Sequence, residues 1–184
     1  MEADFSVELG PDDDTLEFPW SDPDGKLRYY DLKRQQELLL NVEESIQFPD
    51  LGEFLAAVNS PTGQLESVKC DGWFTEDLQA EDEIFGATGK FGSYVDLIFS
   101  DDRRYSFPEH EKFAQQLTKL LKRVPEIPAL AEFIIRRCYF HPDAEGFYFT
   151  FYLFGYGDDE DQCRGSWAIA LKLVENALRQ VSAA

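Results

Sequence analysis

Two adjacent arginines carry the clearest chemical signal in this sequence. Arg136 and Arg137 lie in a stretch of otherwise apolar and aromatic residues, EFIIRRCYF, that is typical of a β-strand. Because side chains alternate between the two faces of a strand, one of the two guanidinium groups must point toward the interior. A buried guanidinium requires an anionic or multiply hydrogen-bonded partner. The pair therefore predicts either an internal ion pair or a site for a carboxylate or phosphate ligand.

The strand that follows in the sequence decides which groups would surround the arginine. Residues 132–140 and 147–154 form a predicted hairpin around residues 141–146. If opposing residue numbers sum to 287, Arg137 shares a face with tyrosine rings and hydroxyls that could receive an anion. The predicted ligand-binding residues are Arg137, Tyr139, His141, Tyr148 and Tyr152. The alternative is that an internal acid, Glu132 or Asp96, pairs with the arginine and makes it structural.

Two tryptophans are candidates for a protein interface, where aromatic residues are enriched. Trp73 follows Gly72 in the sequence KCDGWF, and Trp20 lies in a segment that contains proline and aspartates. Core packing is the other interpretation of Trp20, and the sequence does not separate the two. Trp167 lies on the apolar stripe of a predicted helix, so we expect it in the core.

Few residues could support catalysis or bind a metal. The two histidines, His110 and His141, lie in different predicted elements, and the three cysteines have no C-x-x-C spacing. Cys138 lies three residues before His141, but in a strand the two would point to opposite faces, so Cys138 is interpreted as a small buried hydrophobe. The glycines around Lys90 do not match a phosphate-binding loop, because Ile84 stands where the first glycine is needed. We therefore predict no catalytic residue, no metal site and no cofactor.

The chain is strongly acidic. Thirty-six aspartates and glutamates against 17 lysines and arginines give a net charge of −19. Such a surface repels phosphate backbones and anionic lipid, so we expect neither nucleic-acid nor membrane binding. The charge is expected to favour solubility. The alternative is an acidic face that attracts a basic partner or mimics nucleic acid.

An aromatic stretch near the C-terminus defines the centre of the predicted fold. Residues 147–156 read FYFTFYLFGY, which is typical of a strand covered on both faces. Alternation and turn residues predict the other strands. These are residues 5–9, 15–18, 26–32, 65–75, 94–100 and 132–140.

Helical periodicity predicts a short helix at residues 49–59 and two long amphipathic helices. The long helices are residues 108–123, ended by Pro125, and residues 158–181. Residues 33–47 fit either helix or strand. The predicted fold is a single α+β domain, residues 1–184, with a mainly antiparallel sheet of six or seven strands and the two long helices packed on it.

The ends and composition of the chain bear on its location and function. The start, MEADFSVELG, lacks the basic and apolar regions of a secretory signal, and no apolar run reaches the about 20 residues that span a membrane as a helix. With its odd number of cysteines, this predicts a cytoplasmic protein. The predicted function is a non-catalytic binding domain for a protein partner or a second copy of itself. The alternative is a protein or enzyme that binds a small anionic molecule in the hairpin pocket.

Overall fold

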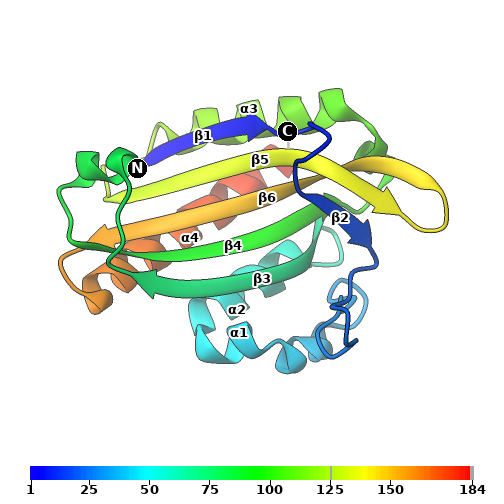
Figure 1. Ribbon diagram of the computed structural model, residues 1–184, viewed down its shortest axis with the longest axis horizontal. Helices are drawn as coiled ribbons and strands as arrows, with labels where there is room; N and C mark the ends of the chain where they lie inside the picture. Colours follow the sequence, from blue (N-terminus) through cyan, green and yellow to red (C-terminus); the bar gives the residue numbers. More distant parts are fainter. Residues whose placement is uncertain (125, 183–184) are drawn as a thin grey trace.

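A computed structural model, which describes residues 1–124 and 126–182, contains a mixed β-sheet with helices packed on one side (Figure 1). The strand order is β1-β5-β6-β4-β3, and β2 pairs with β5 beyond the end of β1. The strands in the described residues are β1 (Glu2–Val7), β2 (Thr15–Phe18), β3 (Leu65–Thr75), β4 (Gly89–Phe99), β5 (Ala129–Phe140) and β6 (Ala144–Gly157). The predicted α+β class is confirmed.

The first two strands make the sheet mixed rather than wholly antiparallel. β1 and β2 run parallel to β5, whereas the pairs β5–β6, β6–β4 and β4–β3 are antiparallel. Residues 8–14 leave the sheet between β1 and β2, although the N–H of Glu8 still donates to the carbonyl of Ile135 over 3.0 Å. Pro11 and three consecutive aspartates in this segment do not suit a regular strand. One edge of the sheet is therefore a strand interrupted by a loop.

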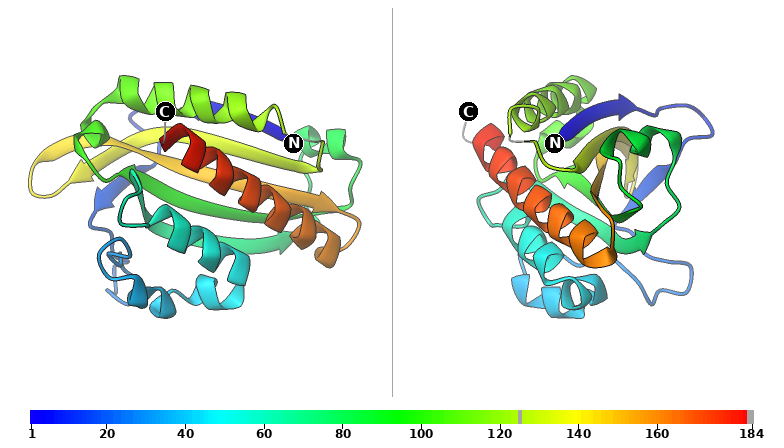
Figure 2. Two further views of the ribbon diagram at one scale, coloured as in Figure 1. Left: turned by 180° about the vertical axis from the view of Figure 1, so that it is seen from behind. Right: turned by 90° about the vertical axis from the view of Figure 1, so that its left-hand side faces the viewer.

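Helices cover one face of the sheet (Figure 2). The α-helices in the described residues are α1 (Glu43–Gln47), α2 (Pro49–Val58), α3 (Phe107–Leu121) and α4 (Glu160–Ser182), and the 3-10 helices are η1 (Gln36–Asn41), η2 (Ala80–Phe85) and η3 (Asp102–Tyr105). α3 and α4 correspond to the two predicted long helices, and their buried apolar residues belong to the main core. The prediction of a two-helix layer is incomplete, because α2 packs beside α4 as a third member.

β6 lies inside the sheet, between β5 and β4, as predicted for residues 147–154. Phe149 and Phe151 are fully buried and contact rings of α3 and α2, respectively. Gly155 continues the same face of β6, and a Cβ at this position would overlap the backbone of Trp167. The glycine therefore allows α4 to approach β6 closely.

The predicted strand at residues 26–32 does not form. Within the described residues, its β-pairing is limited to one isolated bridge between Ser21 and Arg28. The bridge encloses a turn in which Gly25 adopts a positive φ of 68°. The chain instead crosses to the outer edge of β3, where the hydroxyl of Tyr29 donates to Glu66. Residues 33–47 contain η1 and α1, so the helical alternative is correct there. Pro125 lies outside the described residues.

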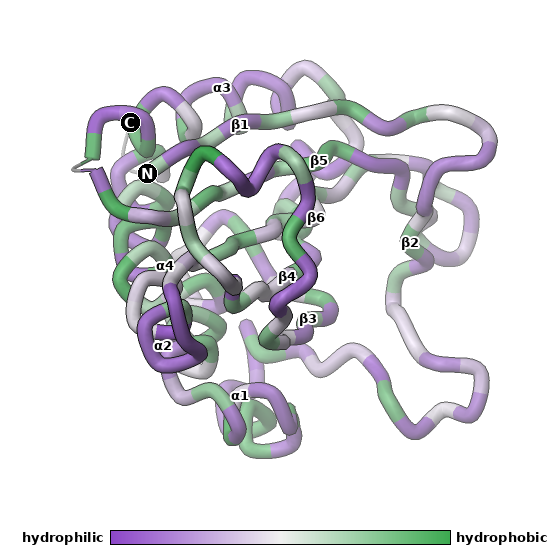
Figure 3. Tube along the Cα trace, turned by 60° about the vertical axis from the view of Figure 1, so that its left-hand side comes forward, coloured by the Kyte–Doolittle hydropathy of each residue, from purple (hydrophilic) through white to green (hydrophobic). Residues whose placement is uncertain are grey.

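The face of the sheet opposite the helices is covered at its two ends. At one end β2, Trp20 and Tyr29 pack on a second apolar cluster, and hydrophilic residues predominate in the loop that follows β2 (Figure 3). The cluster consists of Leu16, Val68, Ile98, Cys138, Phe140 and Tyr148. At the other end Phe85 of η2 stacks on Tyr156 at 4.0 Å. We call the part between these ends the open face, because no helix of the described residues lies over it (Figure 1).

None of the helices in the described part of the chain is long and apolar enough to cross a membrane. The longest, α4, alternates buried apolar residues with exposed charges. Its apolar stripe is therefore explained by packing on the sheet.

Candidate functional site

The composition of the open face depends on the register of the C-terminal hairpin. Opposing residues of β5 and β6 sum to 284, as in the pairs Arg136–Tyr148 and Arg137–Phe147. The register of 287 expected from the sequence is therefore wrong. Because the difference is an odd number, it exchanges the two faces of the strand. Arg136, and not Arg137, lies on the face that carries Tyr148 and Tyr152.

The other three predicted ligand-binding residues do not join these two tyrosines. Arg137 has a side chain that is 39% exposed, and its Nε lies 3.8 Å from Glu145 in the same hairpin. Tyr139 is 40% exposed. His141 is exposed at the turn, with Nε2 3.6 Å from Glu17. The structure thus brings together only part of the predicted site, with Arg136 in place of Arg137.

The charge of Arg136 is matched within the protein, although the residue is only 8% exposed. Its Nη2 lies 2.6 Å from the carboxylate of Glu8, and its Nε donates to the same oxygen over 2.8 Å. Nη1 donates to the hydroxyl of Thr150 over 3.0 Å and lies 3.7 Å from Asp14. The buried arginine is thus paired within the protein, as the alternative to a ligand site expects, but its direct partners are the loop acids Glu8 and Asp14 and not Glu132 or Asp96. An anionic ligand would have to displace Glu8.

The network continues across the sheet to a buried carboxylate. The hydroxyl of Thr150 donates to Asp96 over 2.8 Å, and Nζ of Lys69 lies 3.5 Å from the other carboxylate oxygen. Asp96 is 2% exposed, and burial raises its pKa to about 6 although Lys69 and Thr150 both lower it. Four strands thus contribute one side chain each to a polar network made of Arg136, Thr150, Asp96 and Lys69. In the register of the sheet this network lies between the second apolar cluster and the open face.

Four half-buried aromatic side chains form a continuous row on the open face. Tyr94 and Tyr152 are register partners with ring centroids 6.0 Å apart, and Tyr152 stacks on Phe154 at 6.1 Å. Trp73 contacts Phe154 edge-on at 6.2 Å. Gly92 lies between these two in the register, and a Cβ there would be 2.9 Å from the Phe154 ring and 3.0 Å from the Trp73 ring. The glycine therefore lets both rings lean over β4. We call these four residues the aromatic row.

The two tryptophans predicted as interface anchors lie on this side of the sheet. Trp73 ends the aromatic row, and Trp20 packs against the edge of the second apolar cluster. Lys69 connects the two regions, because its Nζ lies 5.5 Å from the Trp20 ring centroid and 6.0 Å from that of Tyr94. Both tryptophans are half-buried, so each has surface available to a partner.

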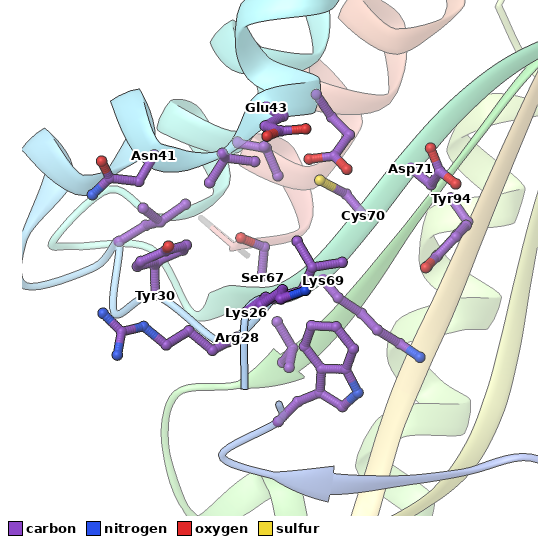
Figure 4. Close-up of a pocket in the computed structure, with 17 residues that line it drawn as sticks. Lys26, Arg28, Tyr30, Asn41, Glu43, Ser67, Lys69, Cys70, Asp71 and Tyr94 are labelled. Atoms are coloured by element: carbon purple, nitrogen blue, oxygen red, sulfur yellow. The ribbon is translucent and has the colours of Figure 1, made fainter. Parts of the chain in front are cut away.

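A groove of about 340 Å³ lies along the outer edge of β3 (Figure 4). Residues 67–71 of β3 form one side of it, and residues 26–32 and 41–44 contribute the other. Its charged lining residues are Lys26, Arg28, Lys69, Glu43, Glu44 and Asp71. Tyr94 and Lys69 belong both to this edge groove and to the side of the sheet that carries the aromatic row, so the two surfaces are continuous.

Burial works against thiolate chemistry in this protein. It raises the pKa of the Cys138 thiol to about 12 and also raises that of Cys70. Cys163 is fully buried in the main core. In residues 1–124 and 126–182, no group of three or more histidine, cysteine, aspartate or glutamate side chains could hold a metal ion.

Reasoning from the sequence identifies only some residues of the site. It names Asp96 as a possible internal acid, and the polar network contains Asp96. A lone polar residue in an otherwise apolar strand, such as Asp96 in YVDLIF or Thr150 in FYFTFYLF, indicates a buried hydrogen-bond partner. Tyr94 and Phe154 carry no such signal, because only the register of the sheet shows which aromatic residues share a face.

Comparison with known proteins does not assign the site. No protein-family model matches the chain, and neither does any curated protein or solved structure. The function therefore has to be inferred from the residues and their arrangement.

Proposed function

We propose that this protein is a binding domain for another protein, and that the open face together with the edge groove forms the binding surface. The observation that carries the proposal is the aromatic row, four half-buried rings on a face that no helix of the described residues covers. Large aromatic side chains dominate the energetics of many protein interfaces. A partner would provide the cover that helices provide on the other face.

The aromatic row is held in place before binding. Its rings contact one another, and Gly92 leaves room for two of them above β4. Association with such a surface loses little side-chain entropy. The polar network beside the row is satisfied internally, so a partner need not supply hydrogen bonds to it.

The dimensions of the face indicate how far a partner must extend. Across the strands, the face is roughly 19 Å wide, because five strands lie about 4.8 Å apart. Along the strands, neighbouring side chains on one face are about 7 Å apart, so a face two side chains long is no longer than it is wide. The resulting area is a few hundred Å², below the about 800 Å² that each partner contributes to a standard interface. The edge groove adjoins the row at Tyr94 and Lys69 and supplies further surface. We therefore expect the partner to cover both.

Capture of a partner from host extract by the tagged protein tests the proposal. Trp73→Ala and Tyr152→Ala should each abolish capture while leaving the circular-dichroism spectrum unchanged. Ile169→Ala is the matched control, because Ile169 is 57% exposed on α4, on the helix side of the sheet. Sedimentation of the purified protein identifies the case in which the partner is a second copy. Capture that is equally strong with Trp73→Ala and with the wild type would contradict the proposal.

A small anionic ligand is the second candidate, and one observation favours it. The edge groove has a volume that suits a small molecule, and Lys26, Arg28 and Lys69 contribute to its lining. Native mass spectrometry of the purified protein tests this candidate. Replacement of Lys26 and Arg28 by alanine should release such a ligand, whereas Trp73→Ala should retain it. Loss of partner capture with retention of the folded state in Trp73→Ala favours the protein partner instead.

A further inference from the structure

We infer that the partner presents lysine or arginine side chains to the open face and that Glu132 receives one of them. This inference rests on the proposed function. It is carried by one row of register partners that crosses the sheet from β1 to β3. The row consists of Asp4, Glu132, Tyr152, Tyr94 and Asp71. It reads acid, acid, tyrosine, tyrosine, acid, and it contains no cation.

The cations that lie on this side of the sheet beside the row are already neutralised. Lys69 and Arg136 belong to the network around Asp96, in which each has an acidic partner. Nζ of Lys90 lies 2.6 Å from the carboxylate of Asp82, which is 2% exposed. Each of these three cations is thus paired with an acid outside the row, so it does little to offset the acids of the row.

Glu132 is the acid of the row with the strongest requirement for a partner. It is half-buried, and its carboxylate makes no ion pair or hydrogen bond within the described residues. Burial raises its pKa, and the carboxylates of Glu8, Asp4 and Glu81 raise it further, although Arg136 lowers it. A cation supplied by a partner would offset both the burial and the repulsion between like charges.

The neighbouring rings suit the same ligand chemistry. Tyr152 is the register partner of Glu132, and the aromatic row continues from it to Tyr94 and to Phe154. An ammonium or guanidinium group is attracted to the face of a tyrosine ring, and arginine can stack on a ring while it pairs with a carboxylate. A phosphate or an acidic segment would be repelled by the three carboxylates of the row. The occupant is therefore a basic segment of a protein.

Glu132→Gln tests this inference separately from the proposed function, because it keeps the shape of the side chain and removes the charge. The probe is a fluorescent hexa-arginine peptide. Its dissociation constant should rise about tenfold for Glu132→Gln. The matched control is Glu160→Gln, which removes an exposed charge at the start of α4 and should change the constant less than about twofold. Equal losses in the two variants would show a response to net charge alone and would overturn the inference.

Two further readouts use the folded protein itself. In NMR spectra the peptide should shift the indole N–H signal of Trp73 and leave that of Trp167 unchanged, because Trp167 is fully buried and donates to Ser93. Glu132→Gln should melt at the same temperature as the wild type or higher, since it removes a half-buried charge among like charges. A lower melting temperature would reveal an internal partner of Glu132, and an unshifted Trp73 signal would place the peptide elsewhere. Either result overturns the inference.

The two proposals can fail independently. If Trp73→Ala abolishes partner capture while Glu132→Gln binds hexa-arginine as the wild type does, the proposed function stands and the basic-segment inference is wrong. If hexa-arginine binding depends on Glu132 but no Trp73-dependent partner is captured, the surface recognises cations and the protein-partner function fails.

Discussion

Phe151 and Tyr152 are adjacent in β6 and point to opposite faces of one sheet. Phe151 is fully buried, stacks on Phe133 at 4.8 Å and contacts Phe54 of α2. Tyr152 is half-buried in an aromatic row without a helix over it. The chain thus supplies its own cover on one face, whereas the other face keeps aromatic surface, a polar network that is matched internally and a row of acids that contains no cation. In the function that we propose, the first face serves stability and the second serves binding.

The largest expected effect separates these two neighbours. Phe151→Ala should lower the free energy of unfolding by about 3–5 kcal/mol, because it removes a fully buried ring and leaves a cavity. Tyr152→Ala should cost less than about 2 kcal/mol, because its ring is already partly in water. Urea denaturation of the two variants measures both values. Similar losses would show that the open face is as much a part of the core as the helix-covered face.

A buried titratable group on each face, His110 on the helix side and Asp96 on the other, responds to pH, and the two respond with opposite sign. His110, on the helix side, is fully buried, and burial lowers its pKa to about 4. Below pH 6.5, the ordinary pKa of histidine, His110 therefore takes up a proton when the protein unfolds. The contribution of His110 is complete above pH 6.5 and is lost as the pH falls toward 4, by roughly 3 kcal/mol. Asp96, with its pKa raised to about 6, contributes fully below pH 3.8 and loses stability as the pH rises to 6.

The way in which stability varies between pH 4 and 6.5, measured by urea denaturation, should therefore depend on which of the two residues is replaced. His110→Phe should give a protein whose stability no longer decreases on acidification and instead decreases as the pH rises, because the remaining carboxyls of Asp96 and Glu132 have pKa values that burial raises. Asp96→Asn should make the loss of stability at low pH steeper than in the wild type. If both variants changed the slope of the free energy of unfolding against pH in the same direction, the opposite roles of these two residues would be contradicted.

Replacement of the adjacent arginines should have a smaller effect on stability, and Arg137 serves as the control for Arg136. Arg136→Met should lower the free energy of unfolding by about 1–2 kcal/mol, because it removes the hydrogen bond to Thr150 and one cation near Asp96, while Glu8 can be hydrated. Arg137→Met should change stability by less than about 0.5 kcal/mol, because Arg137 is partly exposed and its ion pair is long. Thermal denaturation of both variants measures the difference. A larger loss for Arg137→Met would mean that the faces of the hairpin have been assigned the wrong way round.

This hairpin also shows what the sequence can and cannot predict. Most strands and both long helices follow from local pattern, since residues 147–154 and the apolar stripe of α4 need no knowledge of distant contacts, whereas the strand predicted at residues 26–32 does not form. The register does not follow from local pattern. The sequence suggests a six-residue turn at 141–146, but the strands pair until only residues 141–143 remain outside them. This shift of three residues moves the buried arginine from Arg137 to Arg136.

Long-range pairing is the other part that the sequence does not predict. β1 pairs in parallel with β5, although more than 120 residues separate them, as in the pair Glu2–Leu130. No local pattern specifies such a contact. The acidic row that includes Asp4 and Glu132 exists only because of this pairing, so the charge of the open face emerges from the topology of the sheet.

Hydroxyl-radical footprinting of the protein, alone and with its captured partner, tests the central claim most directly. We expect the partner to protect Trp73, Tyr94 and Tyr152 from oxidation. Tyr105 and Tyr139, which are 45% and 40% exposed, should be oxidised equally in both states. Protection of Tyr105 or Tyr139 with an unchanged aromatic row would contradict the claim that the open face is the binding surface.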